Sequence, residues 1–198
     1  KKHQGHALVV SASNNVAEQC LVNAINQAIG SYGSTITFGN YSLQRQGRDA
    51  DVQALISEMN AGGVDAVLLM GGANPAFDLP NGKAFADAAD KVGLRLTLGG
   101  MLNETSANFN WAAPANHQFE SWGDAQAKIG EISLIQPTIS PLFDTRQAEC
   151  SLLMWAGSNN LDKNSDQPYY DYLKANWKVT AFANQTAFVG FQSFWNSS

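Results

Sequence analysis

The sequence has 198 residues, of which 44% are hydrophobic and only 15% are charged. A chain of this length buries enough surface to fold without disulfides or metal, and its composition excludes disordered, collagen-like and coiled-coil proteins. Its 12 basic and 17 acidic residues give a net charge of -5. Nucleic acid is therefore excluded as an expected partner, because binding to phosphates needs clustered Lys and Arg.

Strand and helix patterns alternate through the first hundred residues. Apolar, β-rich runs at 7–11 and 35–38 predict two strands. A stripe of apolar residues at helical spacing predicts a helix that follows Asn14 and stops at Gly30. A second such stripe predicts a helix that ends at Gly62.

The next segment contains the longest apolar strand pattern. Residues 64–70 are nearly continuously apolar, which predicts a central strand of a parallel sheet covered on both faces. Replacing Leu68 in such a strand by Ala is expected to cost roughly 2 to 5 kcal/mol. A helix with Asn81 as its N-cap and Gly93 as its end follows, and then a strand at 94–98. The alternation predicts an α/β fold with a doubly wound, mostly parallel sheet and helices on both faces.

The second half of the chain has weaker patterns. Residues 101–141 lack a sustained helical stripe, so ordered irregular structure is expected there, with a short strand at 132–135. Helices are expected at 148–155 and after Pro168. Because no repeat or long linker occurs, the prediction is a single α/β domain over 1–198. The aromatic C-terminal end looks like a severed edge, and we expect this domain to be excised from a larger multidomain subunit.

Binding residues are expected in the loops that follow the strands, because ligands bind at the carboxyl ends of the strands of open parallel sheets. Three such loops are predicted, at 11–15, 71–75 and 99–106. Trp111 and Trp122 lie near the third loop in sequence and are candidates for stacking, although packing is the commoner use of tryptophan.

The second loop reads GGANP. Gly71 and Gly72 permit close backbone approach, Asn74 offers a donor and an acceptor, and Pro75 fixes the exit of the chain. These residues suit a phosphate, a sugar or the edge of a heterocycle. A plain strand-to-helix turn is the alternative interpretation.

No catalytic or metal-binding constellation is found in the sequence. The motifs GxSxG, HExxH, GxGxxG and the phosphate-binding P-loop are absent. Cys20 and Cys150 lie far apart, so no CxxC pair or cluster-binding run exists, and a buried, inert thiol is expected at each position. No apolar run is long enough to cross a membrane, and no cleavable signal opens the sequence.

A longer pattern is more informative than these short motifs. The string MNAGGVDAVLLMGGANPAFDLP is followed by ESWGD and by IQPTISP in the same order and spacing as in the molybdopterin oxidoreductase superfamily. The chain resembles this superfamily from about Gly5 to Trp195. Within it the chain is most similar to the large iron–sulfur subunit of alternative complex III, a bacterial quinol-oxidising respiratory complex.

The resemblance implies a role in electron transfer. It implies a peripheral protein at the extracytoplasmic, periplasmic face of the bacterial inner membrane. Its partners would be other domains of the same chain and subunits of a membrane-bound complex, including c-type cytochrome and quinol-binding membrane subunits. The chain itself would act as a scaffold and interaction domain rather than as a catalyst.

The resemblance also implies a cofactor cradle. In catalytic relatives the GxNP turn and a Thr-rich loop help to hold molybdopterin guanine dinucleotide. The complex III type of subunit lacks the molybdenum cofactor, so the cradle is expected to be vestigial, and Asn74→Ala is then expected to cost little stability. Neither cofactor nor metal is expected in this chain, and iron–sulfur clusters are expected elsewhere in the full-length protein. The positions carried over are Gly71, Gly72, Asn74 and Pro75, and more loosely Glu104 and Thr105.

Two other functions stay open at this stage. The chain could be the molybdopterin guanine dinucleotide-binding domain of a true molybdenum oxidoreductase, of the polysulfide or thiosulfate reductase type. It could also be a stand-alone α/β module that binds a small ligand in the crevice.

Overall fold

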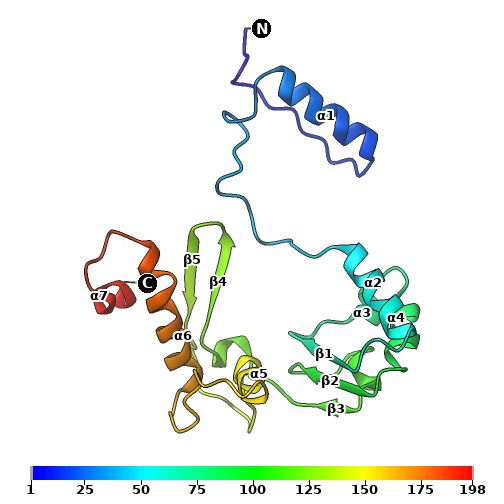
Figure 1. Cartoon of the computed structure of the whole chain (residues 1–198), viewed down its shortest axis with the longest axis vertical. Coiled ribbons are helices and arrows are strands. Elements are labelled where there is room, and N and C mark those ends of the chain that lie inside the picture. Colours follow the sequence, from blue (N-terminus) through cyan, green and yellow to red (C-terminus); the bar gives the residue numbers. More distant parts are fainter. Residues whose placement is uncertain (1, 198) are drawn as a thin grey trace. The chain divides into compact units, whose positions relative to one another are not determined.

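The computed structural model describes residues 2–197. The chain divides into two compact units, which are described separately (Figure 1). The first unit comprises Lys1–Arg45 and Gln126–Ile132, and the second comprises Gln46–Ala125 and Ser133–Ser198. The assignment of 1–198 to a single α/β domain stays a prediction.

The first unit is built around helix α1 (Val16–Ala28), which confirms the helix predicted between Asn14 and Gly30. Asn15 caps its first turn, since the side-chain oxygen accepts hydrogen bonds from the backbone N–H groups of Ala17 and Glu18 at 2.9 and 3.2 Å. Such a cap satisfies donors that the helix itself leaves unpaired.

The strands predicted at 7–11 and 35–38 are not formed, and both predictions are wrong. Asn26 is only 2% exposed. Its side chain accepts a hydrogen bond from the Val9 N–H at 2.9 Å and donates one to the Val9 carbonyl at 2.8 Å. The Asn26 amide thus makes the two backbone hydrogen bonds that a neighbouring strand would otherwise make. Around residues 35–38 a single bridge, Tyr32 to Ile36, takes the place of a strand.

A β-hairpin is formed by β4 (Gly123–Lys128) and β5 (Glu131–Ile135), joined at Gly130. Gly130 adopts a φ of 82°, which glycine reaches without strain. The strand predicted at 132–135 is therefore confirmed as β5. The tip of the hairpin belongs to the first unit, where the backbone N–H of Leu43 donates to the Ala127 carbonyl at 2.9 Å.

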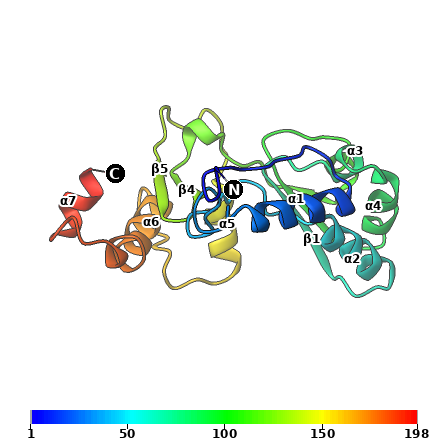
Figure 2. The ribbon, with the colours of Figure 1, turned by 90° about the horizontal axis from the view of Figure 1, so that it is seen from above.

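The second unit contains a parallel sheet of three strands in the order β1, β2, β3 among the described residues. The strands are β1 (Ala66–Met70), β2 (Leu94–Leu98) and β3 (Trp111–Ala112). Helices α2 (Asp49–Asn60) and α4 (Gly82–Ala89) flank the sheet and lie side by side in both views (Figures 1 and 2). The predicted α/β class with a parallel sheet is confirmed, as are the two strands and the two helices.

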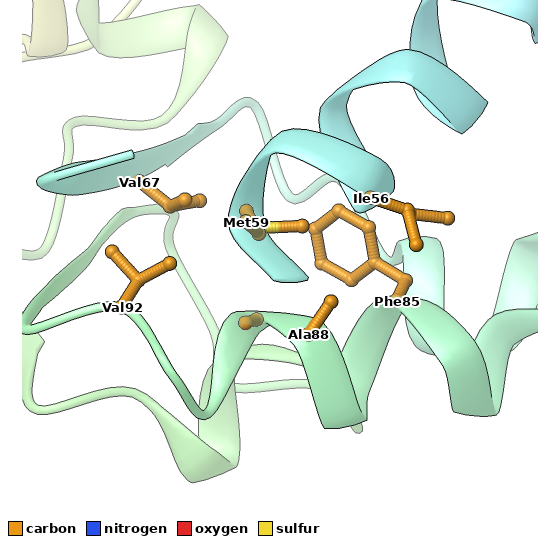
Figure 3. Close-up of a cluster of buried hydrophobic side chains, with 7 residues drawn as sticks. Ile56, Met59, Val67, Phe85, Ala88 and Val92 are labelled. Carbon is orange, nitrogen blue, oxygen red and sulfur yellow. The ribbon is translucent and has the colours of Figure 1, made fainter. Parts of the chain in front are cut away.

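A hydrophobic core joins these helices to the sheet (Figure 3). The core exists because the helical stripe of α2 and the inward positions of α4 both face the side of β1 that carries Val67. The Phe85 ring lies toward Ile56 and Met59 in Figure 3. The buried core residues are Ile56, Met59, Val67, Phe85, Ala88, Ala89 and Val92.

Strand β1 is not covered on both faces, which corrects the sequence prediction. Val67 and Leu69 are 7% and 8% exposed, whereas Leu68 and Met70 are 40% and 39% exposed. Side chains alternate across a strand, so one face of β1 packs on helices and the other stays accessible. The large cost expected for Leu68→Ala is therefore withdrawn, and Val67 takes its place as the buried position.

The remainder of the second unit is helical and aromatic. The helices predicted at 148–155 and after Pro168 are confirmed as α5 (Ala148–Trp155) and α6 (Pro168–Val179). A second buried cluster contains Leu173, Trp177 and Trp195. None of the helices within residues 2–197 is long and apolar enough to cross a membrane. The other short elements are α3 (Pro75–Asp78), α7 (Phe191–Asn196) and the 3-10 turns Ser106–Asn108, Gln118–Glu120 and Phe182–Asn184.

Candidate functional site

Two of the three predicted loops meet at the carboxyl ends of neighbouring strands. Loop 71–75 follows β1 and loop 99–106 follows β2, and these strands pair in parallel with Met70 opposite Leu98. The Asn74 side-chain oxygen accepts two hydrogen bonds from Thr105, one from its backbone N–H at 3.1 Å and one from its hydroxyl at 2.8 Å. The structure therefore brings together the residues predicted for one site.

Thr105 links this contact to the helix that follows. Its hydroxyl accepts a hydrogen bond from the Ala76 backbone N–H at 2.8 Å, in the first turn of α3. The residue is only 3% exposed. Because its N–H and hydroxyl are both buried and both bonded, Thr105 acts as a structural connection between the two loops.

A second pair of residues, absent from the predicted site, reinforces the contact. The Asn103 side-chain amide donates to the carbonyl oxygens of Gly72 and Ala73, each at 3.1 Å. Asn103 and Ser106 also bond reciprocally, backbone N–H to side-chain oxygen, at 2.8 and 2.9 Å. The spacing of three residues between two such polar side chains is the sequence signal that could have identified them.

Glu104 carries the negative charge of the site. Its carboxylate accepts a hydrogen bond from the Asn74 side-chain amide at 2.5 Å. The backbone N–H of Glu104 and the Asn74 amide both lower the pKa of this carboxyl from its usual value. The group is therefore ionised at neutral pH.

The glycines of the turn leave open space. Gly71 and Gly72 have φ values of 61° and 75°, a region that favours glycine. No heavy atom lies within 4 Å of a Cβ built at either position. Pro75 begins α3 at its first turn, as expected for a residue that lacks a backbone N–H. The turn is thus accessible, but its side-chain amide is already occupied.

The remaining predicted loop, 11–15, lies in the first unit, and its polar groups form local contacts. Asn15 caps α1, and the Ser11 hydroxyl donates to the Glu18 carboxylate. The Gln19 side chain donates to the Ser13 carbonyl at 2.6 Å. Because the loop's polar groups serve the start of α1, it is interpreted as a capping segment.

The two cysteines differ in environment. Cys20 is exposed, which departs from the expected buried thiol, whereas Cys150 is buried as expected. Burial raises the pKa of the Cys150 thiol, so it stays protonated at neutral pH. Within residues 2–197, no group of three or more His, Cys, Asp or Glu side chains could hold a metal ion.

The parallel sheet and its flanking helices define a protein of the α/β class, in which loops 71–75 and 99–106, here called the interlocked loops, meet at the carboxyl ends of neighbouring strands. No family model matches the sequence. Among curated proteins, the chain is similar to the menaquinone reductase, molybdopterin-binding-like subunit of Nitratidesulfovibrio vulgaris, with 34% identity over 107 residues. The match covers 52% of this chain and only 15% of that relative.

This similarity supports the predicted relation to molybdopterin oxidoreductase-like proteins over half of the chain. The name of the relative refers to a quinone reductase rather than to alternative complex III. The specific relation to alternative complex III therefore stays a prediction.

The structure changes the expected result of Asn74→Ala. The substitution leaves the buried N–H of Thr105 without its acceptor, and leaving such a group unsatisfied costs about 1 to 3 kcal/mol. We therefore expect a clear loss in the free energy of unfolding, measured by urea denaturation, instead of the small loss expected for a vestigial turn.

Asn81→Ala is the matched control for this measurement. Asn81 precedes α4, is exposed and makes no capping hydrogen bond through its side chain. Its replacement should change stability by no more than a few tenths of a kcal/mol. Equal losses at the two asparagines would show that the Asn74 contacts do not hold the loops together.

Proposed function

We propose that this chain is part of a molybdopterin oxidoreductase-like subunit of a quinone-linked electron-transfer complex, in which it acts as a scaffold and interaction domain. The similarity to the molybdopterin-binding-like subunit of a menaquinone reductase carries the proposal. The complex would oxidise quinol, as alternative complex III does, at the periplasmic face of the bacterial inner membrane. Its neighbours would be a c-type cytochrome and quinol-binding membrane subunits.

The polar groups of the interlocked loops support a role without bound cofactor. Molybdopterin guanine dinucleotide carries a pyrophosphate, which proteins bind with cations and free donors. Neither 71–75 nor 99–106 contains Lys or Arg, and Glu104 places an ionised carboxylate on Asn74. These two loops therefore lack a side-chain cation that could pair with the phosphates of the cofactor.

The open face of the sheet supports the interaction role. Leu68, Met70 and Leu94 are 39% to 43% exposed, and Trp111 is 64% exposed. Leu68 pairs with Leu96, which in turn pairs with Trp111, so these side chains share one face. Grouped apolar side chains at a surface are typical of a contact with another protein surface.

One observation favours a second candidate function, cofactor binding in a true molybdenum oxidoreductase. Gly71 and Gly72 keep the turn open, and the relative is named as molybdopterin-binding-like. In that case the heterocycle edge, rather than the phosphates, would contact the turn.

The interaction role is tested in the native full-length protein. Purification in mild detergent should recover it with a c-type cytochrome and a membrane subunit, identified by mass spectrometry, and the preparation should oxidise a quinol. Trp111→Glu should reduce this co-purification, because a charge would disrupt the apolar face. Phe77→Glu is the control, since Phe77 lies in α3 and is 71% exposed. Recovery of the protein without redox subunits would contradict the proposal.

A further inference from the structure

A cavity of about 450 Å³ lies in the second unit, separate from the interlocked loops. It is formed where two loops of the irregular region, 116–122 and 137–147, meet the start of α6. This volume is within the range of small-molecule sites. The lining residues that matter here are Asn116, Trp122, Arg146, Asp166, Tyr169 and Tyr170.

Arg146 offers an unpaired positive charge at this cavity. Its Nε donates to the Ser151 hydroxyl at 3.0 Å and its Nη1 to the Met154 sulfur at 3.2 Å. Among the described residues, no carboxylate forms an ion pair with it, and its Nη2 has no partner. The bond to Ser151 orients the guanidinium while leaving donors for a ligand.

Asp166 offers an unpaired negative charge at the same cavity. Its carboxylate forms no ion pair or hydrogen bond within residues 2–197. The other acidic lining residue, Glu120, differs because its two oxygens accept from the backbone N–H groups of His117 and Leu142 at 2.8 and 3.0 Å. Glu120 is thus occupied in closing the loop, and Asp166 is available to a ligand.

Aromatic rings form an apolar wall. The rings of Trp122 and Tyr170 lie 4.7 Å apart between centroids. The Tyr170 hydroxyl accepts a hydrogen bond from Nε1 of Trp195 at 3.2 Å, which holds the ring in place. Burial is the main cause that raises the pKa of Tyr169 to about 12, so its hydroxyl stays neutral.

We propose that this cavity binds a free α-amino acid with an apolar side chain. The carboxylate of the amino acid pairs with Arg146, its ammonium pairs with Asp166, and its side chain packs on the wall of Trp122 and Tyr170. A simple anion would meet the carboxylates of Glu120 and Asp166, and a simple cation would meet Arg146. A zwitterion pairs with both charges at once. The proposal is independent of the proposed function.

The charge requirement is tested with three probes on the full-length protein that contains this chain, by titration calorimetry. The probes are L-phenylalanine, 3-phenylpropionate, which lacks the ammonium, and 2-phenylethylamine, which lacks the carboxylate. A hydrogen bond to a charged group is worth about 1.5 kcal/mol or more, so L-phenylalanine should bind at least about 10-fold more tightly than either analogue. Equal affinity for the three, or no binding of L-phenylalanine at millimolar concentration, would overturn the proposal.

Two variants assign the charges. Arg146→Met should remove the preference for L-phenylalanine over 2-phenylethylamine and keep the preference over 3-phenylpropionate. Asp166→Asn should do the opposite. Arg48→Met and Asp65→Asn are surface controls away from the cavity and should bind as the unchanged chain does. If a variant fails to fold, as judged by circular dichroism, the comparison of the three probes on the unchanged chain still decides.

Discussion

Phe85→Ala is expected to lower the free energy of unfolding by about 3 to 5 kcal/mol, the usual cost of removing a buried ring. Phe85 is 3% exposed and belongs to the core that joins α2, α4 and β1. Its ring faces Ile56 and Met59 (Figure 3). The loss combines two terms. One is the lost free energy of transferring the ring out of water, and the other is the cost of the cavity left between the two helices.

Phe77→Ala serves as the matched control for this result. Phe77 lies in the neighbouring α3 but is 71% exposed, so its loss should stay within about 0.5 kcal/mol. Both variants are measured by urea denaturation followed by circular dichroism. Similar losses for the two phenylalanines would mean that the core is not packed as described.

Trp177→Ala is expected to lower the free energy of unfolding by a similar amount, roughly 3 to 5 kcal/mol, because it removes the centre of the second buried cluster. Trp177 is 2% exposed and its ring lies 5.5 Å from that of Trp195. Its indole N–H also donates to the Asp124 carboxylate at 2.6 Å. The indole therefore joins α6 to the first residues of β4 by both packing and hydrogen bonding.

A milder substitution separates these two contributions. Trp177→Phe keeps a ring but removes the donor to Asp124, so it should lose about 1.5 to 3 kcal/mol, the value of a hydrogen bond to a charged group, plus a packing cost. Trp155→Ala is the control, since Trp155 is 49% exposed at the end of α5. A loss at Trp155 as large as that at Trp177 would contradict the assignment of the aromatic core.

The helices could be predicted because their patterns report directly on burial. The apolar stripe of α2 contains Ile56 and Met59, and both are buried against α4. Helix α5 spans Ala148–Trp155, the range that its pattern predicts. Local spacing is sufficient for such elements, because a helix satisfies its own backbone hydrogen bonds.

Strands were less predictable because they depend on partners elsewhere in the chain. Residues 7–11 have a strand-like composition, but the buried side chain of Asn26 takes the place of the neighbouring strand. The apolar run of β1 suggested burial on both faces, yet Leu68 is 40% exposed. Composition therefore predicted that a strand forms here, but not which of its two faces is covered by other elements.

The candidate site was predicted in part. Asn74, Glu104 and Thr105 do come together, because parallel strands place their following loops at one edge. Sequence spacing could not show that Thr105 occupies the Asn74 oxygen, nor that Asn103 holds the backbone of Gly72. These contacts depend on side-chain rotamers across two loops, which spacing in the sequence does not determine.

Cofactor content is the most direct test of the central claim, which is a molybdopterin oxidoreductase-like chain acting without bound cofactor. The full-length protein should be purified from its native source, and its molybdenum measured by mass spectrometry and its pterin by fluorescence after oxidation. Neither molybdenum nor pterin should exceed the background of a matched preparation that lacks the protein. Stoichiometric molybdenum together with pterin would contradict it.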